Sequence, residues 1–114
     1  MFTIRDGEIS EIEKFDLYSE DNDGEEIIVV EQDGEIVGYA QYNSGRDDAQ
    51  IFFMESNAKG CGRAIIDWFK DWCFEITAVN AVETAQSFYT HMGFVANGGT
   101  GYTGQINMTW WDEE

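Results

Sequence analysis

The hydrophobic pattern is strongest between Ile51 and Phe74. Residues 51–54 form a short apolar run with the length and β-rich character of a buried central strand. Apolar residues then recur at three- and four-residue spacing, which predicts a helix lying on a sheet: Cys61, Ala64, Ile65, Trp68, Phe69, Trp72 and Cys73. Residues 57–63, between strand and helix, contain two glycines and are here called the glycine turn.

The pattern before this segment predicts an antiparallel meander. Residues 25–30 and 35–42 are both β-rich, and the Asp33-Gly34 step between them is a strong hairpin signal. Residues 43–48 are polar and should turn the chain into the 51–54 strand. Nearer the N-terminus, residues 2–4 fit a short edge strand, and Ile9, Ile12 and Phe15 fit a brief helix.

The pattern after the helix predicts a second helix enclosed by strands. Residues 75–79 fit a strand parallel to and beside 51–54, because a strand–helix–strand crossover is right-handed. Asn80 is expected to cap the second helix, with Glu83 reaching back to it, and Gly93 is expected to end that helix. A strand should open at 94–95, a glycine-rich loop should occupy 97–104, and a last strand should occupy 105–111. The whole predicts an α/β (α+β) fold over a single domain, residues 1–114.

Composition supports one domain and excludes several classes of protein. The chain has 114 residues, 43% of them hydrophobic, which is enough for a single core, and shows neither a membrane-spanning run nor a secretory pattern. The formal net charge of −17 disfavours binding to nucleic acid or to an anionic membrane. It leaves three interpretations: solubility, attraction of a cationic substrate, or mimicry of a polyanion.

Cysteine and histidine content argues against a metal site and for a reducing compartment. Cys61 and Cys73 lie about 18 Å apart on the predicted helix, so they cannot bond to each other. Two cysteines and one histidine, His91, form no metal-ligand cluster. We therefore expect a cytoplasmic protein with two buried, reduced thiols and no metal.

The glycine turn is a candidate anion site. Glycines at a helix start allow close backbone approach, and the first helical amides point outward unpaired, which attracts phosphate or pyrophosphate. The alternative is a plain turn that needs glycine for its backbone angles. The charge distribution favours the anion site: 13 acids fall between Asp6 and Glu35, whereas half of the six bases are Lys59, Arg63 and Lys70.

Two segments together resemble the GNAT superfamily of N-acetyltransferases. The turn from Asn57 to Gly62 resembles that family's R/Q-x-x-G-x-G/A motif, and residues 88–94 (FYTHMGF), in the helix after Asn80, resemble its F-Y-x-x-x-G-F segment. The resemblance covers about residues 25–111. The chain departs from the family in two places: Asn57 replaces the usual Arg or Gln, and the region before the hairpin is shorter than the family's pair of substrate-binding helices.

The resemblance implies a fold and a cosubstrate. The expected fold is a mixed sheet with an antiparallel N-terminal meander, splayed parallel central strands and helices on both faces. Acetyl-CoA would bind with its pyrophosphate on the glycine turn, whose residues are Asn57, Ala58, Lys59, Gly60, Cys61, Gly62 and Arg63. Its pantetheine arm would pair with a splayed strand and contact Asn80, and a backbone amide near Phe53 or Met54 would polarise the thioester.

The resemblance also implies catalytic roles. Tyr89 matches the family's general acid, since a phenol with a pKa near 10 is protonated at neutral pH; the alternative is a core aromatic. The resemblance does not identify the base that deprotonates the amine. Glu55, at the end of the cofactor-binding strand, is our first candidate, with Glu31 behind it, although any one carboxylate in so acidic a chain is more often a solvated charge. The alternative is a site without a base, which relies on an amine that arrives neutral. Tyr102 is a candidate to line the acceptor site.

We therefore predict an acetyl-CoA-dependent N-acetyltransferase acting on a primary amine, either of a cationic small molecule or of a lysine side chain. The alternative is a GNAT-like fold used as an acidic binding or inhibitor protein. Trp110 and Trp111 could form a homodimer contact, or simply belong to an edge strand with one ring buried and one exposed.

Overall fold

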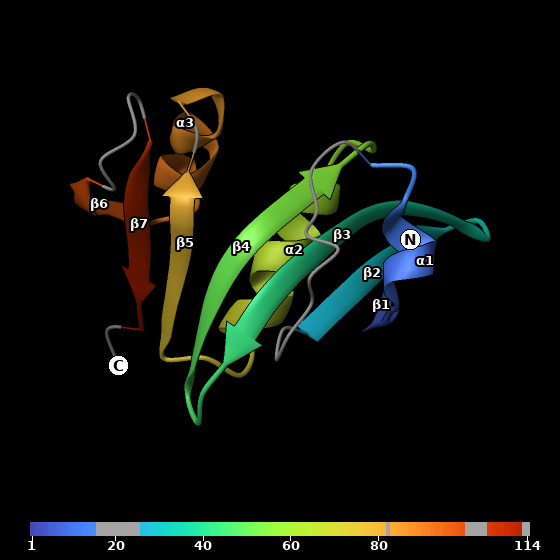
Figure 1. Cartoon of the computed structure of the whole chain (residues 1–114), viewed down its shortest axis with the longest axis horizontal. Helices are drawn as coiled ribbons and strands as arrows, with labels where there is room; N and C mark the ends of the chain where they lie inside the picture. The colour runs from blue at the N-terminus through green and yellow to red at the C-terminus, as the bar shows by residue number, and fades with distance from the viewer. Residues whose placement is uncertain (16–25, 82, 100–104, 113–114) are drawn as a thin grey trace.

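One twisted seven-stranded sheet organises the chain (Figure 1). The computed structural model describes residues 1–15, 26–81, 83–99 and 105–112. The strand order is β1-β2-β3-β4-β5-β7-β6. The strands are β1 (Thr3–Asp6), β2 (Glu26–Gln32), β3 (Glu35–Ser44), β4 (Asp48–Ser56), β5 (Glu75–Ala81), β6 (Val95–Gly99) and β7 (Ile106–Trp111); the helices are α1 (Ile9–Ile12), α2 (Cys61–Lys70) and α3 (Glu83–His91).

The predicted meander is present and is extended by β1. β1 to β4 pair antiparallel in chain order. Asp33 and Gly34 turn the β2–β3 hairpin with φ of 53° and 83°, which is the positive-φ pair that a two-residue turn requires. Residues Ile27 to Val30 of β2 are all buried, because the sheet is covered on both faces at this strand.

Two hydrophobic clusters lie on opposite faces of the sheet. The larger one joins α2 and the end of α3 to the strands, with Ile65, Phe69, Tyr89 and Phe94 among its buried members. The smaller one lies under α1 and contains Ile12, Phe15, Ile27, Val29 and Tyr39. In Figure 1 α2 lies behind the sheet and α1 in front of it, so the expectation of helices on both faces is confirmed.

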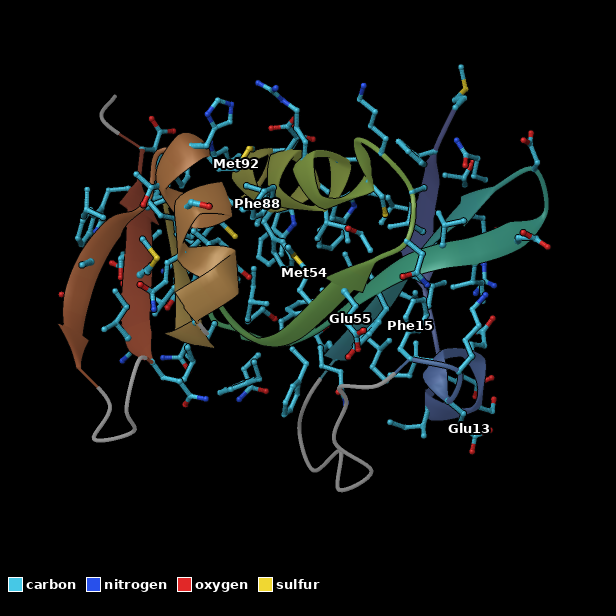
Figure 2. The ribbon with its side chains drawn as sticks, turned by 90° about the horizontal axis from the view of Figure 1, so that it is seen from above. Glu13, Phe15, Met54, Glu55, Phe88 and Met92 are labelled. Carbon is cyan, nitrogen blue, oxygen red and sulfur yellow. The ribbon has the colours of Figure 1, made fainter. Side chains whose placement is uncertain are left out.

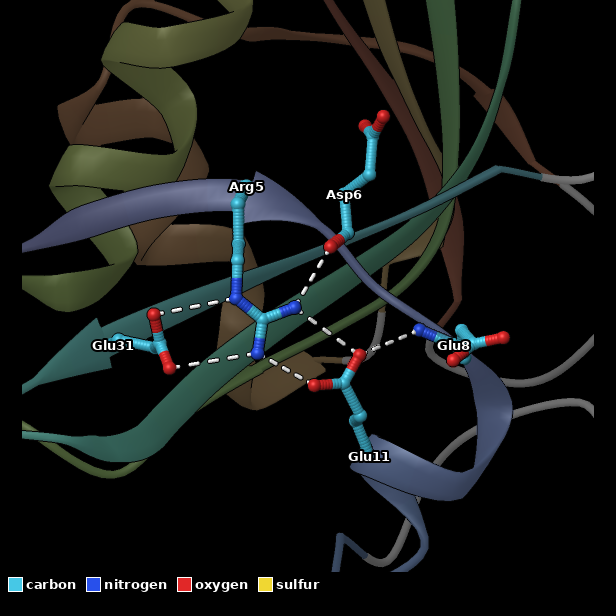
Figure 3. Close-up of polar contacts among 5 residues, drawn as sticks. All are labelled: Arg5, Asp6, Glu8, Glu11 and Glu31. Atoms are coloured by element: carbon cyan, nitrogen blue, oxygen red, sulfur yellow. Dashed lines mark hydrogen bonds and ion pairs between the residues drawn. The ribbon is translucent and has the colours of Figure 1, made fainter.

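An ion-pair network holds α1 to the outer strands (Figure 3). The Arg5 guanidinium on β1 binds the Glu11 carboxylate of α1 at 2.5 Å and the Glu31 carboxylate of β2 at 3.2 Å. Glu11 also accepts a hydrogen bond from the Glu8 amide at 3.0 Å, which steadies the first turn of this short helix. These contacts fix the position of a helix of only four residues against the sheet.

The central strands β4 and β5 pair only at their beginnings. Their parallel pairing covers residues 48–51 of β4 and 75–78 of β5. Phe52 is an extra residue in β4 relative to β3, and β5 carries an irregularity between Ala78 and Ala81 relative to β7. Such bulges bend strands, and Figure 1 shows β4 and β5 moving apart toward their C-terminal ends. The predicted splay is therefore present.

Three local predictions are wrong. α2 ends at Lys70, short of Cys73. The amides of Trp72 and Cys73 both donate to the Phe69 carbonyl in a turn, and Cys73 is still buried, so the apolar spacing continued past the end of the helix. Asn80 lies in β5, and α3 is described from Glu83, so the predicted helix start at Asn80 is wrong. Residues 97–99, expected in a loop, belong to β6. The side-chain amide of Asn97 donates to the Thr109 hydroxyl at 3.0 Å.

Candidate functional site

The glycine turn connects the end of β4 directly to α2. The Asn57 amide donates to the Val37 carbonyl at 2.7 Å, which ties the end of β4 to β3. Gly60, the N-cap of α2, has a φ of 85°, a left-handed conformation that glycine adopts without strain. The amides of Gly62 and Arg63 then fall in the first helical turn, whose geometry leaves N–H groups without intrahelical partners.

The charge around this turn suits an anion. Lys59 and Arg63 are both exposed, and the first turn of α2 contains no acidic residue. Exposed cations beside unpaired amides attract phosphate groups through both charge and hydrogen bonding. The backbone and the charges together make this turn the strongest candidate anion site in a chain of net charge −17.

Three elements meet at Gly62. A Cβ atom placed on this residue would lie 3.2 Å from Cζ of Phe88 in α3 and 3.5 Å from the Ser56 hydroxyl at the end of β4. The glycine therefore allows β4, α2 and α3 to approach closely at this point. Neither Phe88 nor Ser56 was predicted at the site; Phe88 opens the FYTHMGF segment, and its position there is the signal that could have identified it.

The diverging part of β4 exposes its residues to both faces of the sheet. Phe53 packs with the α1-side cluster and Met54 with the α2-side cluster. Figure 2 shows Met54 beside Phe88 on the side of α2 and α3, and Glu55 lying toward Phe15 and α1. Both predicted residues, Phe53 and Met54, thus follow the last β4–β5 pair, Ile51 with Ala78.

Tyr89 is part of the core and also carries a proton suited to acid catalysis. Its side chain is 6% exposed, and its ring lies 5.3 Å from that of Phe88 and 5.2 Å from that of Phe94. Burial raises the pKa of Tyr89 to about 12, because the charged phenolate loses its hydration. The phenol is therefore fully protonated at neutral pH, so its place in the core is compatible with the predicted acid role.

Glu55 lies on the opposite face and has a partner that the sequence analysis missed. The Tyr39 hydroxyl donates to Oε2 of Glu55 at 3.3 Å, across the β3–β4 pair that joins these two residues. Glu55 is half-buried, whereas Tyr39 is fully buried with its ring 4.9 Å from Phe15. Only the strand register could have revealed this pair, because the two residues are 16 positions apart.

The candidate acid and base thus lie on different faces of the sheet. Tyr89 belongs to the cluster beneath α2, and Glu55 lies on the side of α1. The pairing of β4 with β5 ends at Ile51 and Ala78, so the two strands are separated from each other where Glu55 lies. A thioester placed between these strands could therefore receive a nucleophile from one face and a proton from the other.

The remaining predicted residues are placed less favourably. Glu31 lies on β2, two strands away from Glu55, and forms an ion pair with Arg5 of β1. This contact favours a structural role for Glu31. Asn80 lies in the part of β5 beyond its last pair with β4. Tyr102 lies outside the described residues. Within the described part of the chain, no group of His, Cys, Asp and Glu could hold a metal ion.

β7 lies between β5 and β6 in the sheet, so the edge-strand interpretation of its two tryptophans is wrong, although one side chain is half-buried and the other is exposed. Trp110 packs near Gly93, and Lys70 of α2 lies 5.0 Å from its ring centre. Trp111 is 47% exposed. A homodimer contact at these rings remains a prediction.

Comparisons with solved structures show the same fold. Ard1 from Thermoplasma volcanium aligns with a TM-score of 0.68 at 20% identity, covering 99% of both chains. The ribosomal-protein-S18-alanine N-acetyltransferase from Escherichia coli aligns with a TM-score of 0.67 at 20% identity, covering 97% of this chain and 94% of that one. A GNAT acetyltransferase from Elizabethkingia anophelis, solved with acetyl-CoA bound, aligns with a TM-score of 0.63 at 12% identity, covering 97% and 98%.

The sequence comparisons give one match, to a family model. No curated protein sequence matches the chain. A family model described as "Acetyltransferase (GNAT) domain" matches residues 23–96, which include the meander, the glycine turn and α3. No helix in the described residues has the length and apolar character needed to cross a bilayer. With the splayed central strands and the glycine turn in place, the family match establishes that the chain belongs to the GNAT superfamily of acetyltransferases, enzymes that use acetyl-CoA.

Proposed function

We propose that this acetyltransferase acetylates the primary amine of a cationic acceptor, either a small molecule or a lysine side chain. The observation that carries the proposal is the separation of β4 from β5 beyond the Ile51–Ala78 pair, directly next to the cationic glycine turn. Where the two strands separate, an extended arm of a ligand can form backbone hydrogen bonds with their facing edges, and the turn can bind the phosphate groups of that ligand.

The residues at this place fit acetyl-CoA. The amides of Gly62 and Arg63 and the charges of Lys59 and Arg63 suit its pyrophosphate, and Gly62 leaves no Cβ in the way. The backbone of Phe53 and Met54 and the end of β5 at Asn80 suit its amide-bearing arm. When bound, acetyl-CoA supplies an activated acetyl thioester; the chain itself binds, orients and moves protons.

Two side chains would move the protons. Glu55 accepts a proton from the ammonium group of the acceptor, so that the neutral amine can attack. Tyr89, kept protonated by burial, holds at its hydroxyl the proton that the leaving thiolate requires. Glu55 lies on the α1 side of the sheet and Tyr89 belongs to the α2-side cluster, so the two proton transfers would take place from opposite faces.

Charge supports a cationic acceptor. Thirteen acids fall between Asp6 and Glu35, in the half of the chain that supplies α1 and the first three strands. A field of this sign raises the local concentration of cations. The E. coli neighbour is named for acetylation of an alanine of ribosomal protein S18, so a peptide α-amine belongs in the acceptor panel alongside polyamines, amino sugars and lysine peptides.

Coenzyme binding is tested first, by calorimetric titration of acetyl-CoA into the protein. We expect saturable binding that is weakened about tenfold or more in a Lys59→Ala/Arg63→Ala variant, because two phosphate contacts are lost. Arg46→Ala, which removes an exposed cation from the β3–β4 turn, is the matched control and should bind as the wild type does. Absence of binding at about millimolar coenzyme would contradict the proposal.

Turnover is tested by release of free thiol in the presence of each amine. A Glu55→Gln variant should lose about a hundredfold in kcat, the lower range for loss of a general base, with its affinity for acetyl-CoA retained. Glu35→Gln, an exposed acid of the hairpin, should keep full activity. Acetylation by wild type of neutral amines only would remove the cationic acceptor from the proposal.

Two further points belong to the proposal. Burial of both thiols, Cys61 and Cys73, fits a reducing compartment such as the cytoplasm. A homodimer contact through Trp110 and Trp111 is tested by sedimentation of the wild type and of Trp111→Ser. A monomer at every concentration would exclude this contact.

A further inference from the structure

Tyr39 is the most deeply buried polar side chain next to the proposed base. Its exposed fraction is 0%, and its hydroxyl donates to Oε2 of Glu55 at 3.3 Å. The two residues are directly paired neighbours on β3 and β4. The hydrogen bond thus links a buried hydroxyl to the carboxylate across the strand pair.

The surroundings of Tyr39 restrict its motion. The ring packs against Phe15 at 4.9 Å, tilted by 46°, and belongs to the same cluster as Ile12 and Val29. Close packing on all sides prevents the ring from changing rotamer without opening the core. The hydroxyl is therefore a fixed donor, whereas Glu55 is half-buried on a flexible stem.

The location of the pair relates it to the reaction. Glu55 follows the last β4–β5 pair by four positions along β4, and it precedes the glycine turn by two. A carboxylate that takes a proton from an amine must be held in one orientation as the amine attacks. A fixed donor on one carboxylate oxygen provides such an orientation.

We infer that Tyr39 is a positioning residue for Glu55, and that it holds this carboxylate toward the acceptor. The inference rests on the proposed function, because it requires Glu55 to act as the base. The proton passes from the acceptor nitrogen to the Glu55 carboxylate, and Tyr39 keeps its own proton throughout. Because Phe15 packs on the Tyr39 ring, the α1 region supports the position of the carboxylate.

The kinetic test replaces Tyr39 by Phe, which keeps the ring and removes the hydroxyl. We expect kcat to fall about tenfold, a part of the hundredfold or more that a general base contributes, with the KM for acetyl-CoA unchanged. Tyr42→Phe is the matched control: Tyr42 is also buried on β3 but packs in the α2-side cluster, so kcat should not change. Full activity of Tyr39→Phe would overturn the inference.

A double-mutant cycle separates positioning from a general structural effect. In a Glu55→Gln background, Tyr39→Phe should cause no further loss of kcat, because the group that it orients is already gone. An equal loss in both backgrounds would overturn the inference. A wild type that acetylates no amine would overturn the proposed function, whereas an active wild type with an unaffected Tyr39→Phe variant would overturn only the role of Tyr39.

A spectroscopic test covers the case in which Tyr39→Phe does not fold. Protein labelled with ¹³C at the tyrosine Cζ reports the hydrogen bonding of each hydroxyl. Glu55→Gln should shift the Tyr39 resonance and leave that of Tyr42 in place. A Tyr39 resonance that does not respond to Glu55→Gln would overturn the inference.

Discussion

Individual residues at the candidate site combine a packing role with a proposed chemical role. Tyr89 fills the core between Phe88 and Phe94, and the burial that makes it a core residue also keeps its proton in place. Gly62 contributes by lacking a side chain, since a Cβ would meet the Phe88 ring at 3.2 Å. Substitutions at such positions must therefore be evaluated for stability and for activity separately.

Replacement of Tyr89 by Phe separates these two roles. The ring remains, so the free energy of unfolding should change by less than about 1 kcal/mol, and acetyl-CoA affinity should be retained. The proton donor is lost, so kcat should fall by about a hundredfold. Thiol-release kinetics, calorimetry and urea unfolding measure the three quantities; an equal loss of affinity and kcat would argue that Tyr89 only supports the coenzyme site.

Between secondary-structure elements, close contacts set the shape of the site. β3, β4 and α2 meet at Gly38, where an added Cβ would lie 2.4 Å from the Cys61 sulfur and 3.0 Å from the Glu55 carbonyl oxygen. α2 and α3 are joined by Lys70, whose ammonium donates to the Met92 carbonyl at 2.6 Å and lies over the Trp110 ring. These contacts hold the glycine turn against β4 and hold α3 against α2.

Gly38→Ala should disrupt the first of these junctions. The new methyl group collides with a backbone oxygen as well as with a side chain, so the free energy of unfolding should fall by about 2–4 kcal/mol. Gly34→Ala is the matched control: Gly34 has a φ of +83° but no atom within 4 Å, so only the backbone strain of about 1 kcal/mol applies. Urea unfolding compares the two variants. A larger loss for Gly34→Ala would contradict the packing argument.

Lys70→Met should loosen the second junction. The methionine keeps an apolar stem but loses the hydrogen bond to α3 and the cation–π contact, which together should cost about 1–2 kcal/mol. Lys59→Met, at an exposed lysine of the turn, should change the stability by less than about 0.5 kcal/mol. Faster amide hydrogen exchange in α3 would locate the effect there; uniform exchange changes would contradict it.

The whole molecule combines a strongly acidic surface with several titratable groups in its interior. The net charge of −17 is spread along the chain, whereas the buried thiols and phenols sit in the core beneath α2. Burial raises the pKa of Cys61 to about 11 and that of Cys73 to about 12. It also raises the pKa of Tyr42 and of Tyr89 to about 12. Each group therefore binds its proton more tightly in the folded state than in the unfolded chain.

The sign of the resulting pH dependence follows directly. Their ordinary pKa values are 9.0 for cysteine and 10.0 for tyrosine, so the stabilisation is fully present below about pH 9. It is lost as the pH rises from about 9 to 12, because unfolding then releases protons. Urea unfolding between pH 8 and 11 should show this decline, and Cys73→Ala should make it shallower. A stability independent of pH over this range would contradict the assignment.

Local pattern determined most of the elements and the glycine turn, because these depend on neighbouring residues. The β-rich runs of β2 and β3, the Asp33-Gly34 turn, the apolar stripe of α2 and the family motifs were all visible along the chain, and they led correctly to the fold and to acetyl-CoA. Errors arose where pairing with β7 overrode local preference: Asn80 and residues 97–99 became strand.

The tertiary structure decided which residues meet. Tyr39 and Glu55 are brought together by the β3–β4 register, and Phe88 reaches Gly62 only because α3 packs beside α2. Glu31 of β2 forms an ion pair with Arg5 of β1, which also binds Glu11 of α1. No local pattern reveals this contact among three elements. Strand, helix and turn propensities are local, so the sequence identified the family and a candidate turn for the cofactor. Side-chain contacts depend on long-range packing, so only the folded chain identified Tyr39 as the partner of the proposed base, Glu55.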